Sequence, residues 1–132
     1  MFKEMTVQTE VRTQLVLIDS EVRGAIQESG IEEGLCVLWV PHTTAALTIN
    51  ENADPDVVRD ILHETGKIIP FEDGYHHMEG NSAAHIKSSL FGPSLTLIIC
   101  GGRPVLGTWQ SIYFCEFDGP RRRRLLMKVL EG

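Results

Sequence analysis

The chain has 132 residues, of which 42% are hydrophobic and 23% are charged, and its formal net charge is −6. This length supports one globular domain with a core of its own and excludes two, so we expect a single domain over residues 1–132. The negative charge argues against general binding to nucleic acid or to an anionic membrane, because binding either partner requires lysine and arginine to neutralise its negative charge. The N-terminus MFKEMTVQTE lacks an apolar signal core and no run is long enough to span a bilayer, so we expect a cytoplasmic protein.

Two short strands and a helix are predicted over residues 5–30. Apolar residues alternate with polar ones over residues 5–11, and residues 14–18 form a second extended run, as in a hairpin or meander. Asp19 and Ser20 then offer N-caps to a helix that Gly30 closes.

A third and a fourth strand are predicted on either side of His42. The continuous apolar run 35–40 lies between Gly34 and Pro41, a pattern typical of a strand buried on both faces. His42 follows this run directly, and the apolar positions over residues 47–49 predict the next strand.

A second helix is predicted to begin at Asp54 and Pro55, because an N-cap acceptor followed by proline is a favoured helix start. Its apolar stripe lies at positions 57, 58, 61 and 62, and Gly66 is expected to end it. The periodicity disappears over residues 67–80, which predicts a loop.

Three of the five histidines lie in the stretch HHMEGNSAAHIK, residues 76–87. Asn81 or Ser82 is a good N-cap for a short helix that Gly92 stops. His85 would then project from the first turn, near the positive end of the helix dipole, while His77 lies on the incoming loop. A metal or an anion would fit there.

The C-terminal third is expected to be mostly strand. Residues 94–100 form an apolar run that Gly101 and Gly102 end, and residues 108–117 are apolar on both faces, as expected of a strand in the centre of a sheet or at a subunit contact. Polar and apolar residues alternate over residues 121–130, which is a weak indication of a further strand. A total of about seven strands and three short helices predicts a compact α+β fold, mostly antiparallel sheet or sandwich.

The three cysteines, Cys36, Cys100 and Cys115, all lie in these strand-like runs. An odd and scattered set is a poor disulfide framework, so we expect reduced thiols in the core. Trp109 is assigned to core packing as well.

Three histidines, His42, His77 and His85, lie at polar breaks beside ordered elements. Neutral imidazoles are common ligands of zinc-like ions, so we predict that these three converge on a divalent metal, zinc or magnesium. An open position on the metal would leave room for water or a phosphate oxygen. The alternative is that the histidines bind an anion directly.

Further residues are predicted to assist this site. Glu51 and Asn52 join His85 as candidates for catalysis, because a carboxylate near metal-bound water acts as a base or orients a ligand histidine. The candidates for binding phosphate are the helix start and three cations, namely Asn81, Lys87, Arg103 and Arg121.

Five motifs occur in one consistent order from residue 42 to residue 121. They are His42-Thr43-Thr44; Asn50-Glu51-Asn52-Ala53-Asp54; His77 with Glu79-Gly80-Asn81 and Ala84-His85-Ile86-Lys87; Ser94 leading to Gly107-Thr108-Trp109-Gln110; and Glu116 with Asp118-Gly119-Pro120-Arg121. With these motifs and its length, the chain resembles the YjbQ-like family, often labelled secondary thiamine-phosphate synthases. The resemblance implies an α+β fold, a homotrimer with the polar cluster near subunit boundaries, and a weak synthase activity.

Three functions are left open. The first is a transferase that joins a hydroxymethylpyrimidine diphosphate to a thiazole phosphate and releases pyrophosphate, with a phosphorylated small molecule as substrate. The second is a trimeric metal- or small-ligand-binding module with incidental catalysis. A metal-dependent phosphoester hydrolase is less favoured. No P-loop, dinucleotide fingerprint or Ser-His-Asp elbow points to another class.

Overall fold

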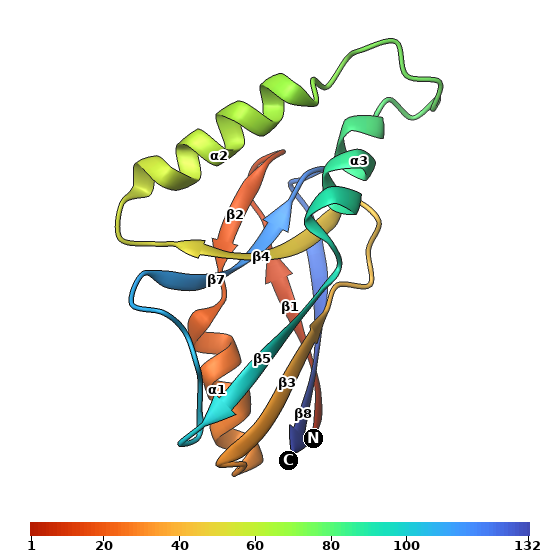
Figure 1. Cartoon of the computed structure of the whole chain (residues 1–132). Helices are drawn as coiled ribbons and strands as arrows, with labels where there is room; N and C mark the ends of the chain where they lie inside the picture. The colour runs from red at the N-terminus through yellow and green to blue at the C-terminus, as the bar shows by residue number, and fades with distance from the viewer.

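Two antiparallel sheets and three helices make up the fold, which the computed structural model describes for all residues 1–132 (Figure 1). The strands are β1 (Phe2–Gln8), β2 (Gln14–Leu17), β3 (Glu33–Trp39), β4 (Ala45–Glu51), β5 (Ser94–Cys100), β6 (Arg103–Pro104), β7 (Gln110–Glu116) and β8 (Arg122–Glu131). The helices are α1 (Asp19–Ser29), α2 (Pro55–Ile68) and α3 (Ser82–Phe91). The larger sheet has the order β1-β8-β3-β5-β6 and the smaller β2-β7-β4, which confirms the predicted α+β class.

The main core lies between the larger sheet and the two elements that cover its inner face, α1 and the smaller sheet. Val22 and Ile26 of α1 and Phe114 of β7 pack in one cluster with alternate residues of β3, β5 and β8. Every residue of β7 after Gln110 is buried, so the strand predicted to be central is the middle strand of the smaller sheet. Burial of these apolar side chains is the main stabilising contribution to such a fold.

The outer face of the larger sheet carries apolar side chains that nothing in the chain covers. Leu35 pairs in register with Leu130 on one side and with Ile98 on the other, and all three are exposed, as is Trp39. The prediction that residues 35–40 are buried on both faces was therefore wrong for the single chain. Cys36 and Leu38 point into the core, and the residues that alternate with them, Leu35, Val37 and Trp39, lie on the outer face.

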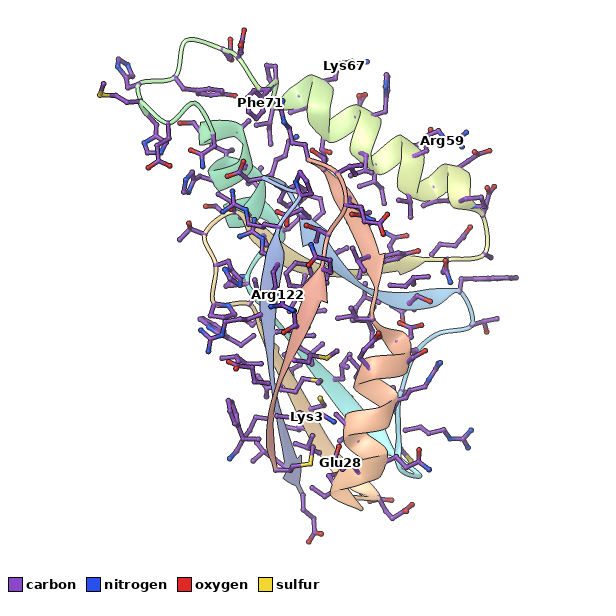
Figure 2. The ribbon with its side chains drawn as sticks, turned by 180° about the vertical axis from the view of Figure 1, so that it is seen from behind. Lys3, Glu28, Arg59, Lys67, Phe71 and Arg122 are labelled. Atoms are coloured by element: carbon purple, nitrogen blue, oxygen red, sulfur yellow. The ribbon has the colours of Figure 1, made fainter.

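Helix α2 begins as predicted, with the Asp54 side chain accepting the Asp56 N–H at 2.9 Å and Pro55 in the first turn. It does not end at Gly66 but continues to Ile68. A single glycine costs a helix only about 1 kcal/mol, and here the stop comes with Pro70, which cannot continue the helix. No residue of α2 is fully buried, and Arg59 and Lys67 point outward from it (Figure 2).

Two further packing predictions were wrong. Trp109 is 63% exposed, because it precedes β7 in a turn instead of lying within the strand. Cys100 is exposed at the end of β5, whereas Cys36 and Cys115 are buried, and all three cysteines are free.

The β3–β4 loop, the start of α3 and the β7–β8 turn meet at the end of the molecule away from the two chain termini (Figure 1). Helix α3 is held there by Ala84, which packs with Ala46, Cys115 and Phe117. The ring of Phe91 meets that of Phe117 edge-on at 5.1 Å. No helix of the structure has the length and hydropathy that a membrane span requires.

Candidate functional site

A hollow of about 490 Å³ opens where these three segments meet. Its wall is polar, and it is lined by Pro41, His42, Thr43, Thr44, His77, Glu79, Asn81, His85, Asp118, Arg121 and Arg123. The structure thus brings the three histidines singled out in the sequence to one hollow, together with Asn81 and Arg121.

His77 and His85 form the outer side of this hollow. Their ring centroids are 5.4 Å apart and the rings are perpendicular. His77 Nε2 lies 3.9 Å from a carboxylate oxygen of Glu79, which is too long for a direct hydrogen bond. The loop 69–81 delivers His77, and the first turn of α3 delivers His85, as the sequence predicted.

His42 is held from the opposite side by strand β8. The backbone N–H of Arg124 donates a hydrogen bond of 2.8 Å to His42 Nε2. Burial, followed by the positive charges of Arg123 and Arg124, lowers the pKa of His42, and Glu116 opposes this only in part. Both the hydrogen bond and the lowered pKa favour the neutral imidazole.

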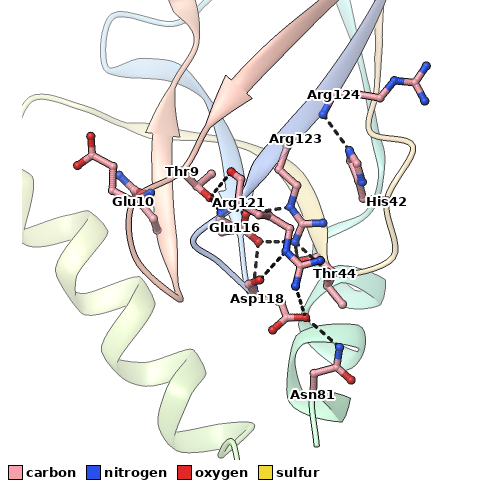
Figure 3. Close-up of polar contacts among 11 residues, drawn as sticks. Thr9, Glu10, His42, Thr44, Asn81, Glu116, Asp118, Arg121, Arg123 and Arg124 are labelled. Carbon is pink, nitrogen blue, oxygen red and sulfur yellow. Dashed lines mark hydrogen bonds and ion pairs between the residues drawn. The ribbon is translucent and has the colours of Figure 1, made fainter. Parts of the chain in front are cut away.

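A buried ion pair lies beneath the hollow (Figure 3). Arg123 and Glu116 are 2% and 0% exposed, and Arg123 donates to the carboxylate through Nε at 2.8 Å and also through Nη2. The same Nη2 donates to the Thr44 hydroxyl at 2.8 Å. Since Thr44 lies two residues from His42, this network fixes the loop that carries the histidine.

Thr9 and Gly119 complete the packing around Glu116. The Thr9 hydroxyl donates to Glu116 at 2.8 Å and accepts the Arg121 N–H at 2.9 Å. A Cβ at Gly119 would stand 2.5 Å from the Val11 carbonyl oxygen and 2.8 Å from Glu116 Cγ. Only glycine allows the β7–β8 turn to approach this closely.

A second ion pair forms the floor beside α3. Asp118 accepts from Asn81 Nδ2 at 2.9 Å and from Arg121 Nη2 at 3.1 Å. The Asn81 side chain therefore does not cap α3, and its Oδ1 is buried without a partner in the chain. Asp118 had been noted only as part of a family motif, not as a site residue.

Arg123 was missed from the sequence, although a signal was present. Residues of a strand alternate between its two faces, so Arg123 shares a face with Leu125, Met127 and Val129, all of which are buried. An arginine at such a position needs an internal partner, and Glu116 on the neighbouring apolar run was the available carboxylate.

Four predicted residues lie outside the hollow in the single chain. Glu51 and Asn52 are at the far end of β4, roughly 20 Å from Thr44 by the length of the strand. There the Tyr113 hydroxyl donates to the Glu51 carbonyl at 2.9 Å. Arg103 lines a separate hollow of about 420 Å³ with Arg23 and Glu32.

Lys87 points to the core side of α3 and is 7% exposed. Its Nζ lies 5.8 Å from the centroid of the Phe117 ring, and burial lowers its pKa. It does not line the hollow.

The structure gathers no three His, Cys, Asp or Glu side chains closely enough to hold a metal ion as they stand. His42 already accepts a hydrogen bond at Nε2. A divalent metal held by His42, His77 and His85 thus stays a prediction, and it would require these side chains to move.

The sequence matches the family described as "UPF0047 protein YjbQ-like" over residues 3–132. It is 52% identical to UPF0047 protein MJ1081 of Methanocaldococcus jannaschii, over 94% of this chain and 90% of that protein. It is 49% identical to UPF0047 protein YugU of Bacillus subtilis, over 98% and 99% of the two chains.

Solved structures of similar proteins have the same fold. A YjbQ/UPF0047 family protein of Clostridium acetobutylicum is 51% identical, with a TM-score of 0.95 over 97% of this chain and 99% of that one. A protein of Sulfolobus solfataricus with 30% identity also gives a TM-score of 0.95, over 100% and 97% of the two chains.

Proposed function

Because this chain belongs to the YjbQ-like UPF0047 family, we propose that its polar hollow binds the phosphate group of a phosphorylated small molecule. The single observation that supports this proposal is the convergence of His42, His77 and His85 with Arg121 and Arg123 on one hollow. Nitrogen donors of this kind are the usual partners of phosphate oxygens.

Attraction to the anion rests on donor geometry more than on net charge. Arg123 is paired with Glu116, and Arg121 with Asp118, so the formal charges of these four residues cancel. The histidines, the asparagine and the free edges of the arginines remain to donate. Such a site selects a ligand by the directions of its oxygens, and its affinity should fall only moderately with added salt.

We propose further that the bound molecule is a hydroxymethylpyrimidine diphosphate and that the protein is a weak thiamine-phosphate synthase. The bond between the pyrimidine methylene carbon and the diphosphate oxygen breaks, and its electron pair leaves with pyrophosphate. The nitrogen of a thiazole phosphate then forms the new C–N bond. Little proton transfer is needed, which suits a hollow rich in donors, where Asp118 is paired with Arg121 and Glu116, beneath the hollow, with Arg123.

We propose a homotrimer as the working form. The exposed apolar face made by Leu35, Trp39, Ile98 and Leu130 supports association with other copies of the chain. Glu51 and Asn52 would contribute to the reaction only if another copy brought them to the hollow, because β4 holds them away from it in their own chain.

The second candidate is a ligand-binding module whose catalysis is incidental. It is favoured by the position of Glu51 and Asn52, since these two predicted catalytic residues are not beside the histidines. A metal-dependent phosphoester hydrolase is the third and needs the three-histidine metal centre.

One experiment separates these candidates. Purified protein without an affinity tag is incubated with the pyrimidine diphosphate and the thiazole phosphate. Thiamine phosphate, pyrophosphate, released phosphate and bound metal are measured together, and binding of inorganic phosphate is measured on the same preparation. We expect thiamine phosphate and stoichiometric pyrophosphate. Phosphate binding without product would favour the module, and phosphate release that depends on stoichiometric metal would favour the hydrolase. His85→Ala protein, purified in the same way, controls for contaminating enzymes.

A further inference from the structure

We infer that His42 and Arg123 form a two-donor cradle for one phosphoryl group, in which His42 is a neutral donor through Nδ1–H and not a metal ligand. This inference rests on the proposed binding of phosphate in the hollow, and it assigns the roles of two side chains within it. Arg123 was not among the predicted site residues.

The role of His42 follows from its hydrogen bond with β8. A backbone N–H can only donate, so His42 Nε2 must present its lone pair to Arg124, at 2.8 Å. A neutral imidazole carries one N–H, which is then on Nδ1. The nitrogen left for the hollow is therefore a donor and has no lone pair for a metal.

The role of Arg123 follows from which of its nitrogens are used. Nε and Nη2 donate to Glu116, and Nη2 donates also to Thr44. Nη1 makes no hydrogen bond within the chain, and Arg123 lines the hollow although it is 2% exposed. The guanidinium is thus buried and fixed through Nε and Nη2, and its free N–H groups are the two on Nη1.

The two donors depend on consecutive residues of β8, because Arg124 holds His42 and Arg123 is itself the second donor. Arg124 holds His42 through its backbone, and its own side chain is tied to Glu4 of β1, with Nε donating at 2.8 Å. Arg123, on the other face of the strand, is held by Glu116 and Thr44 (Figure 3). Donors that are fixed before the ligand arrives lose little entropy on binding it.

The ligand that suits this arrangement is a tetrahedral phosphoryl group. It presents oxygens in several directions, so it can accept from an imidazole and from a guanidinium edge at the same time. A metal ion would meet only N–H groups at these two positions.

The tautomer is tested first, in the ligand-free protein. Heteronuclear NMR of protein labelled with nitrogen-15 in histidine and arginine shows which ring nitrogen carries the proton. We expect protonated Nδ1 and unprotonated Nε2 for His42. Inorganic phosphate should then shift the Nδ1–H resonance of His42 and the side-chain N–H resonances of Arg123. A proton on Nε2, or coordination of added Zn²⁺ by His42, would overturn the inference.

Binding of inorganic phosphate by variants is the second measurement, with circular dichroism to check folding. His42→Ala should weaken binding about 10-fold, as expected for the loss of one donor to an anion. His42→Asn should weaken it less, because its amide nitrogen lies near the former position of Nδ1. Arg123→Lys should also weaken binding, and His63→Ala, on the exposed side of α2, should leave it unchanged.

The outcomes separate this inference from the proposed function. No phosphate binding by the wild-type protein would remove both. Phosphate binding that His42→Ala and folded Arg123→Lys leave unchanged would keep the proposed function and remove the cradle. If Arg123→Lys does not fold, the NMR shifts and the two His42 variants still test whether His42 and Arg123 form the cradle.

Discussion

Arg123 and Glu116 form an ion pair that the protein encloses almost completely, with hydrogen bonds from Nε and Nη2 to the two carboxylate oxygens. Buried ion pairs are costly to assemble, because both charges lose their water. They are also costly to break, since removing one partner leaves an uncompensated charge in the interior. Here the pair holds Thr44 and, through it, the loop of His42.

Replacing Glu116 by alanine should destabilise the fold by about 3–5 kcal/mol, because it leaves the Arg123 guanidinium buried without a counter-charge. The free energy of unfolding from a urea titration measures this. Glu4→Ala is the matched control, because it breaks the exposed ion pair with Arg124 and should cost at most about 1 kcal/mol. Equal effects of the two substitutions would mean that enclosure of the pair has no energetic consequence.

Stability should fall as the pH falls below the ordinary range of a glutamate. Burial alone would raise the pKa of Glu116, but hydrogen bonds from Arg123, the Asp118 N–H and Thr9 together lower it from 4.5. A pKa that is lower in the folded state means that the unfolded state binds the proton first. The stabilisation is therefore complete above the unfolded pKa and is lost as the pH falls through the folded one.

Unfolding free energies of the wild type and of Glu116→Gln, measured from pH 7 to acid, check this expectation. The difference between the two should shrink with acid, since glutamine does not titrate. A difference that stays constant across the range would show that Glu116 has an unshifted pKa.

Much of the local structure follows from signals over a few residues. The Asp54-Pro55 start of α2 and the Gly30 stop of α1 lie where their capping chemistry predicted them. The prediction that α2 ends at Gly66 was wrong, because a single glycine destabilises a helix only slightly and the hydrogen bonds of the neighbouring residues outweigh this cost.

The sequence singled out several residues that line the hollow, including His42 and Arg121, which are far along the chain from the other two histidines. His77 and His85 are close in sequence, and both line the hollow. Glu51 follows His42 by nine residues, but seven-residue β4 carries it away from the hollow. Arg123 meets Glu116 because the turn between β7 and β8 brings the end of one strand close to the start of the other, although the two strands belong to different sheets. In the sequence, only the alternation of buried and exposed positions along β8 indicated this contact.

Association is expected to depend on the outer face of the larger sheet. Ile98 is 61% exposed there, beside Leu35. Light scattering at micromolar concentration should give the mass of a trimer for the wild type and a smaller mass for Ile98→Glu, because a charge in an apolar interface costs several kcal/mol. Met78→Glu, in an exposed loop, should stay trimeric. A monomer mass for the wild type would refute the proposed assembly.

His85→Ala should abolish formation of thiamine phosphate while the fold survives. His85 lies in the first turn of α3, where alanine is at least as good a helix former, so circular dichroism should not change. If His85 stabilises the charge that develops as pyrophosphate departs, its loss should reduce the rate about 10²–10³-fold.

Lys87→Met is the matched control on the same helix, because Lys87 packs beside Phe117 and does not line the hollow. Turnover of both variants beside the wild type decides: full activity of folded His85→Ala would exclude this histidine from the reaction, whereas an equal loss in Lys87→Met would trace the effect to the packing of α3.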